Sequence, residues 1–185
     1  MGFKSRFVFF SSSCHVLLNN KNFFKTVIWV MGILGKKKYY ISNNINIKSC
    51  GGVLLLKSYN YLYFKYCVLY SILIKNTIYG LMRPFKSYVL IKGLGFKLSY
   101  LGGGNIINFK LGYSHNIKYY VSNFLKIDIL PKKAKAFCVI GVDYQKVKES
   151  VARIKAFKKN NSYKYRGIYD FGRSYFFKNN KRKTS

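Results

Sequence analysis

The chain has 185 residues, of which 34 are Lys or Arg and 4 are Asp or Glu, and its formal net charge is +30. Half of the residues are apolar and 19% are aromatic, which excludes a disordered chain, because disordered chains are poor in aromatic residues. A compact body with this charge repels itself unless an external polyanion supplies counter-charge, and either nucleic acid or an anionic membrane surface can do so.

The first 60 residues give the weakest secondary-structure pattern. Apolar segments at residues 7–10, 23–30 and 53–56 predict strands or other buried segments. The pairs Asn43–Asn44 and Gly51–Gly52 predict turns.

A helix is expected over residues 62–84, where apolar residues recur at helical spacing and Pro84 marks the end. A membrane span needs about 20 consecutive apolar residues. The longest uncharged apolar stretches, Val27–Gly35 and Tyr66–Ile74, are bracketed by lysines and are too short. We therefore interpret both as core elements and expect no membrane insertion.

Alternating apolar and polar residues predict a series of short strands from residue 88 onward. Gly93 and Gly95 interrupt the first of them and allow a bulge or a close backbone approach. The segment Gly102–Asn105 predicts the turn of a β-hairpin. The expected strands are residues 88–90, 96–100, 107–111, 117–121, 125–129 and 137–142.

The clearest helix follows at residues 143–157. Asp143 is a favourable N-cap residue, and its charge suits the positive end of the helix dipole. Val147, Val151 and Ile154 recur at helical spacing and predict one buried face. Strands followed by a capped helix predict an α+β fold with a helix on one face of an antiparallel sheet.

The four acids, Asp128, Asp143, Glu149 and Asp170, are scattered, and the first 127 residues contain none. Enzymes that use paired carboxylates need two of them on one substrate, so this class is excluded. We expect each acid to cap a helix or to form an ion pair. The segment Gly32–Lys36 is not a phosphate-binding loop, because Lys37 stands where that motif needs Ser or Thr.

The four cysteines, Cys14, Cys50, Cys67 and Cys138, contain no CxxC pair. Zinc sites use closely spaced ligand pairs, so we expect no metal site and interpret the cysteines as reduced, mostly buried thiols. His115 is expected in a turn. We therefore expect no enzyme, no catalytic residue and no cofactor.

Residues 157–185 interleave nine Lys or Arg residues with aromatic residues and two glycines. Cations neutralise phosphates, aromatic rings stack on unpaired bases, and glycine allows close backbone approach. This pattern favours nucleic-acid binding by a segment that orders on its polyanion. The alternative is a basic membrane-surface or ribosome-maturation factor that uses the same charge on anionic lipid.

Four segments, in order, match motifs of one protein family from about residue 74 onward. They are Ile91–Lys97 (IKGLGFK), Asn105–His115 (NIINFKLGYSH), Gly141–Val147 (GVDYQKV) and Tyr163–Ile168 (YKYRGI). In these segments the chain resembles the bacterial-type "L-six" (universal uL-six) family of large-subunit ribosomal proteins. Asn160, Asn161 and Ser162 replace prolines that flank the family's last motif, and Tyr165 replaces its first glycine.

The resemblance implies two tandem α+β domains, each with small antiparallel sheets around one helix. We expect a divergent first domain at residues 1–84, a second at 85–157 and a basic rRNA-binding tail at 158–185. It also implies a structural protein of the large ribosomal subunit that binds rRNA near the sarcin–ricin loop and the translation-factor site, beside neighbouring ribosomal proteins. The expected rRNA-binding residues are Lys158, Lys159, Tyr163, Lys164, Tyr165, Arg166, Gly167, Arg173, Lys178, Lys181, Arg182 and Lys183.

The composition is rich in Lys, Asn, Ile, Tyr and Phe, as very AT-rich codons would produce. This indicates an organelle-encoded protein of the mitochondrial matrix, bound to the ribosome, with a plastid-type organelle as second choice. Residues 3–26 are basic and acid-free, as in a transit peptide. We nevertheless expect them to be retained in a protein made in the compartment where it works.

Overall fold

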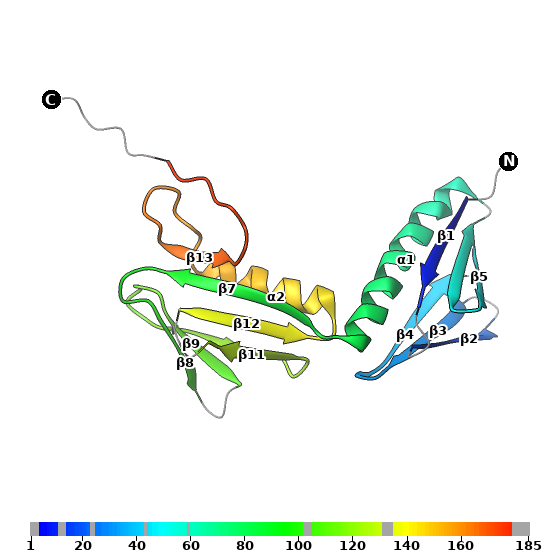
Figure 1. Ribbon diagram of the computed structural model, residues 1–185, viewed down its shortest axis with the longest axis horizontal. Coiled ribbons are helices and arrows are strands. Elements are labelled where there is room, and N and C mark those ends of the chain that lie inside the picture. The colour runs from blue at the N-terminus through cyan, green and yellow to red at the C-terminus, as the bar shows by residue number, and fades with distance from the viewer. Residues whose placement is uncertain are drawn as a thin grey trace. The chain divides into compact units, whose positions relative to one another are not determined.

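The computed structural model describes residues 4–10, 14–22, 25–42, 44–58, 60–101, 105–130 and 135–178. The chain forms two units (Figure 1): an N-terminal unit of Met1–Pro84 with Val142–Tyr144, and a C-terminal unit of Phe85–Gly141 with Gln145–Ser185. Each unit packs antiparallel sheets against one helix. This confirms the expected α+β fold with two similar halves.

The N-terminal unit contains two three-stranded antiparallel sheets, with strand orders β1-β6-β5 and β2-β3-β4. The apolar runs that were expected to be strands or other buried segments coincide with β1, β3 and β6, whereas β2, β4 and β5 were not predicted. Gly51 and Gly52 form the predicted turn between β5 and β6. The strands are β1 Lys4–Phe9, β2 His15–Asn22, β3 Lys25–Gly32, β4 Gly35–Ser42, β5 Ile45–Cys50 and β6 Val53–Ser58.

Helix α1, Tyr61–Met82, covers these sheets and buries Cys67, Ile74 and Leu81 against them. The helix confirms the prediction, but it ends two residues before the expected boundary. Arg83 is extended, with φ −142° and ψ 124°, because a residue that precedes proline is sterically disfavoured in the helical conformation.

The C-terminal unit contains a four-stranded antiparallel sheet, ordered β11-β12-β7-β13, and a three-stranded sheet, ordered β10-β9-β8. Helix α2, Tyr144–Phe157, packs on them. The predicted strands and helix are confirmed here, while the glycines of the predicted hairpin turn, Gly102–Gly104, lie outside the described residues. The strands are β7 Phe85–Lys92, β8 Lys97–Leu101, β9 Ile106–Lys110, β10 Ile117–Tyr120, β11 Leu125–Ile129, β12 Ala136–Gly141 and β13 Gly167–Asp170.

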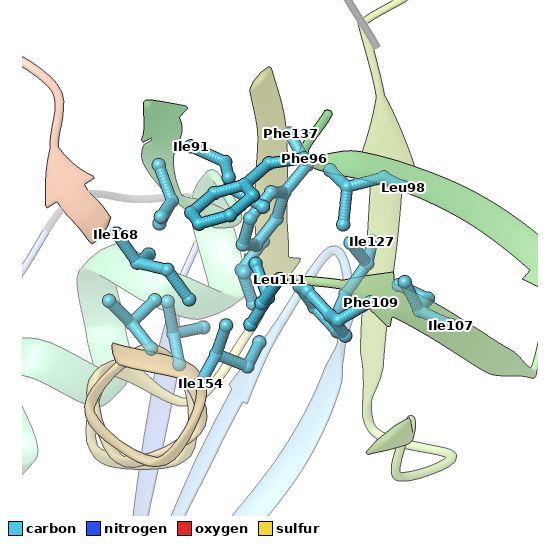
Figure 2. Close-up of a cluster of buried hydrophobic side chains, with 14 residues drawn as sticks. Ile91, Phe96, Leu98, Ile107, Phe109, Leu111, Ile127, Phe137, Ile154 and Ile168 are labelled. Carbon is cyan, nitrogen blue, oxygen red and sulfur yellow. The ribbon is translucent and has the colours of Figure 1, made fainter. Parts of the chain in front are cut away.

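Both sheets and the helix of the C-terminal unit contribute to one apolar core (Figure 2). Phe109 is fully buried, with its ring centroid 5.9 Å from that of Phe137 and 5.7 Å from that of Phe157, both in edge-on geometry. Ile154 of α2 and Ile168 of β13 lie in the same cluster. The predicted helix face of Val147, Val151 and Ile154 is buried, as expected.

All four acids form ion pairs, which confirms the role expected for them. Four carboxylates can neutralise at most four of the 34 Lys and Arg residues one to one, so most of the positive charge in the sequence depends on counter-charge from outside the chain. The pairs are Lys37–Asp143 at 2.6 Å, Lys126–Asp128 at 3.2 Å, Arg153–Glu149 at 2.6 Å and Lys155–Asp170 at 2.6 Å.

The cysteines are free thiols, and three of them are buried while Cys50 is exposed. Burial raises the pKa of Cys14, Cys67 and Cys138, and the thiolate is the reactive form of cysteine. Brief alkylation of the folded chain at neutral pH should therefore modify Cys50 first, as checked by peptide mass analysis. Equal labelling of all four thiols without denaturant would contradict this expectation.

Candidate nucleic-acid interface

Residues 158–178 fold onto the C-terminal unit, whereas the sequence predicted a tail that orders on a polyanion. Strand β13 pairs antiparallel with β7, with Ile168 opposite Ile91 (Figure 1). Ile168 and Tyr169 are each only 2% exposed. Burial of these two side chains anchors this part of the segment to the sheet through contacts within the chain itself.

The stretch before β13 forms a closed loop, which we call the basic loop (residues 158–166). The Ile168 N–H donates to the Lys158 carbonyl oxygen at 3.1 Å, and the Asn161 N–H donates to the Arg166 carbonyl oxygen at 2.9 Å. These two bonds bring the ends of the loop together at the sheet edge. The two hydrogen bonds therefore hold the loop closed, and the side chains of the residues between them extend from it.

Asn161 organises the tip of the basic loop. Its Oδ1 accepts hydrogen bonds from the backbone N–H groups of Tyr163, at 2.8 Å, and Lys164, at 3.1 Å. An Asn side chain that bonds to the backbone two residues on forms a turn by itself. Asn161 therefore builds locally a turn at a position where the family motif is flanked by proline.

Tyr165 is the only non-glycine residue with a positive φ among the described residues, at +37°. This conformation favours glycine, which explains physically why glycine suits this position of the motif. Here the Tyr165 ring stacks on Phe177, with centroids 3.8 Å apart and an interplanar angle of 20°. One ring face is thus covered within the chain, and only the other is left for the predicted stacking on a base.

The residues after β13 return to the basic loop and brace it. The Lys178 N–H donates to the Ser162 carbonyl oxygen at 2.9 Å. The Tyr175 hydroxyl accepts the Asp170 N–H at 2.9 Å, and the Tyr175 ring packs edge-on against Tyr169 at 4.9 Å between centroids. The segment 171–178 and the basic loop therefore form one surface, which we call the loop surface.

The buried side chain of Tyr169 contacts the backbone of the basic loop, a role that the sequence did not indicate. Its hydroxyl lies 3.5 Å from the carbonyl oxygens of Asn161 and Arg166. Burial, followed by the neighbouring Tyr175 and Tyr165, raises the pKa of Tyr169, so the phenol stays protonated and keeps its donor. Strand β13 buries Gly167, Ile168 and Tyr169 in succession, so no alternating pattern in the sequence marked Tyr169 as buried.

Gly167 is buried, although the sequence assigned it to RNA contact. Its φ is +132°, and a Cβ there would lie 2.7 Å from the Asn160 Cα and 2.7 Å from the Lys159 carbonyl oxygen. The close approach that glycine permits is therefore between Gly167 and the backbone of Lys159 and Asn160. The structure thus gives Gly167 a packing role.

The predicted cations gather on the loop surface. Lys159, Lys164, Arg166, Arg173 and Lys178 are all exposed, and within the described residues none of them takes part in an ion pair with a carboxylate. The nearby acid, Asp170, is held by Lys155 at 2.6 Å. Positive charge on this surface is therefore available to an external anion.

Two further predicted residues, Lys158 and Tyr163, lie at the base and near the tip of the basic loop. Lys158 is half-buried, and its ammonium lies 3.9 Å from the ring centroid of Tyr113, a residue that the sequence did not single out. Tyr163 is 52% exposed, so it presents an accessible ring. The remaining predicted residues, Lys181, Arg182 and Lys183, lie outside the described residues.

The structure was also searched for a membrane-spanning helix and for a metal centre. No helix within the described residues has the length and hydropathy to cross a bilayer, and those residues contain no cluster of potential metal ligands. His115 is exposed, in an irregular segment before β10. The loop surface carries exposed cations beside aromatic rings, a combination suited to binding a nucleic-acid backbone and its bases.

No family model matches the chain, but the chain is similar to many curated proteins, including the following three. "Large ribosomal subunit protein uL6" of Phytoplasma mali is 33% identical over 158 residues, which is 84% of this chain and 83% of the relative. The protein of the same name from Borrelia garinii subsp. bavariensis is 33% identical over 147 residues, covering 78% and 79%. "Large ribosomal subunit protein uL6m" of Prototheca wickerhamii is 31% identical over 131 residues, 66% of each chain.

Proposed function

Because this chain belongs to the uL6 family of large ribosomal subunit proteins, we propose that it joins the large subunit by binding rRNA through its loop surface. The observation that carries the proposal is the set of exposed, unpaired cations on a loop with a fixed base. Lys164 and Arg166 flank the strained Tyr165 and neutralise phosphates, while Tyr163 stacks on a base. The protein is a structural component of the subunit.

The proposed position on the ribosome is the one that the family resemblance implies, near the sarcin–ricin loop and the translation-factor site. We further propose a mitochondrial ribosome as its home. The match to a uL6m protein supports this assignment, and so does the Lys- and Asn-rich composition that AT-rich codons produce. A plastid ribosome is the second choice.

Replacing Lys164 and Arg166 together with Glu should weaken binding of the full chain to a large-subunit rRNA fragment that contains the sarcin–ricin loop. If each cation neutralises one phosphate, the slope of log affinity against log salt should fall by about 1 for each residue, about 2 together. Filter binding across a salt series measures both quantities. Unchanged affinity and slope would remove the loop surface from the interface.

The matched control is Lys97→Glu with Lys110→Glu, because these exposed lysines face each other across β8 and β9 of the same unit. This variant carries the same change in net charge at a different place. An equal loss of affinity in both variants would show that net charge alone, and not the loop surface, drives binding. Sedimentation with large subunits, compared with flotation on anionic vesicles, separates rRNA binding from membrane-surface binding.

A further inference from the structure

A second cationic and aromatic surface lies in the N-terminal unit, on the sheet β2-β3-β4. Side chains alternate between the two faces of a strand. Ile28, Val30 and Ile41 are fully buried on the face that packs in the core. The opposite face carries the set that we call the Trp29 face, which comprises Leu17, Trp29, Lys36, Lys38 and Tyr40.

The strand register brings these residues together. Leu17 lies opposite Trp29, and Trp29 lies opposite Lys38, so the three form one row across the sheet. The Lys38 ammonium is 5.9 Å from the centroid of the Trp29 ring and 5.5 Å from that of the Tyr40 ring. The Lys36 ammonium is also 5.9 Å from the Trp29 ring. One aromatic platform is therefore flanked by two cations.

The platform is open to solvent. Leu17 is 55% exposed and Tyr40 is 53% exposed, while Lys36 and Lys38 are exposed and Trp29 is half-buried. Distances near 6 Å are the outer limit of cation–π attraction, so the lysines rest loosely on the rings. A flat ligand can take their place while the ammonium groups move to its charged edge.

The charge of the N-terminal unit selects the ligand. Asp143 is the sole acid of this unit in the sequence, and its carboxylate binds Lys37, whose side chain belongs to the opposite face of β4. Lys36 and Lys38 are exposed on the face away from this ion pair, so an external anion can reach them. A protein partner would have to supply an apolar patch ringed by carboxylates, whereas single-stranded nucleic acid supplies phosphates and flat rings in one chain.

We propose that the Trp29 face binds an unpaired segment of RNA, with bases stacked on Trp29 and Tyr40 and with phosphates at Lys36 and Lys38. This site goes beyond the proposed function, because it lies in the other unit and takes single-stranded nucleotides. It gives the N-terminal unit an RNA contact of its own. Sequence preference is weak, since stacking accepts any base.

Trp29 is the only tryptophan of the chain, so its fluorescence reports this site alone. Titration of the full chain with a single-stranded oligouridylate should quench Trp29 in a saturable, salt-sensitive manner. Lys36→Glu with Lys38→Glu should abolish the quenching. Lys48→Glu with Lys57→Glu, two exposed lysines of the other sheet in the same unit, should retain it. Circular dichroism checks that both variants stay folded.

Stacking is tested separately with fluorescently labelled oligouridylate, in the Lys164→Glu/Arg166→Glu background that disables the loop surface. Trp29→Leu should weaken binding by roughly 5- to 160-fold, as expected for loss of stacking on one base, and Trp29→Phe should retain most of the affinity. Quenching that persists in this background supports the site even if rRNA binding through the loop surface proves wrong.

Three results would overturn the proposal. Trp29 fluorescence could stay constant while labelled oligouridylate binds. Quenching could be equal in the Lys36→Glu/Lys38→Glu variant and in the unaltered chain. Finally, Trp29 fluorescence could change with protein concentration in the absence of RNA, which would assign the face to contact between copies of the chain.

Discussion

Replacing Phe109 with Ala is expected to lower the free energy of unfolding by about 3–5 kcal/mol, the range measured for loss of a buried Phe side chain. Phe109 is 0% exposed and contacts the rings of Phe137 and Phe157 edge-on. Its removal leaves a cavity between both sheets and α2, and the surrounding strands cannot collapse into it without breaking their ladder. Both sheets and the helix therefore lose packing contacts at once.

Urea denaturation followed by circular dichroism measures this loss. The matched control is Phe176→Ala, because Phe176 is 85% exposed and the same atoms are removed from solvent-facing positions. We expect that control to stay within about 0.5 kcal/mol of the unaltered chain, as surface substitutions usually do. A small effect of Phe109→Ala, equal to that of the control, would contradict the core shown in Figure 2.

Replacing Gly167 with Ala is expected to displace the basic loop and to weaken rRNA binding together with stability. The backbone conformation at φ +132° costs about 1–3 kcal/mol for a residue with a side chain. The new Cβ also meets backbone atoms of Lys159 and Asn160 at 2.7 Å. Backbone cannot rotate away as a flexible side chain would, so the loop must move off the strand.

Gly172→Ala separates these two causes. Gly172 also has a positive φ, +79°, but nothing lies within 4 Å of its would-be Cβ. Both variants strain the backbone, and only Gly167→Ala adds the steric clash. We expect thermal unfolding and filter binding to show the larger loss for Gly167→Ala. Equal losses would mean that the packing of residues 159–160 against β13 does not hold the loop surface in place.

Most of the secondary structure of the C-terminal unit could be predicted from sequence, although strand β13 was not. Strand β9 gives a clear pattern: Ile107 and Phe109 are buried and are followed by Asn108 and Lys110, because one face of the strand lies in the core. The buried face of α2 could also be predicted, since Val147, Val151 and Ile154 recur at the helical period. Local periodicity indicates burial wherever an element has one solvent-exposed face and one buried face.

The N-terminal unit was harder to predict because its sheets break this pattern. Strand β4 begins with Gly35 and three consecutive lysines, a run that is typical of a solvated loop. Lys36 and Lys38 remain exposed to solvent beside the Trp29 ring. Lys37 forms an ion pair with Asp143, which lies 106 residues further along the chain. A strand whose cations are accommodated by such distant contacts carries no local signal.

The sequence by itself determined the charge and the family, and it favoured the kind of ligand that we propose. A net charge of +30 with almost no acids requires a polyanion, and cations interleaved with aromatic residues favour RNA among polyanions. These inferences depend on composition and short motifs, which need no knowledge of which segments meet in space.

Only the tertiary structure decided how the charge is presented. It joined residues 167–170 to β7, buried Gly167 and placed the Tyr165 ring on Phe177. It also aligned Leu17, Trp29 and Lys38 across three strands. Pairing between strands is set by burial and hydrogen bonding summed over distant segments, so the position of each cation follows from the assembled sheet and not from its neighbours in sequence.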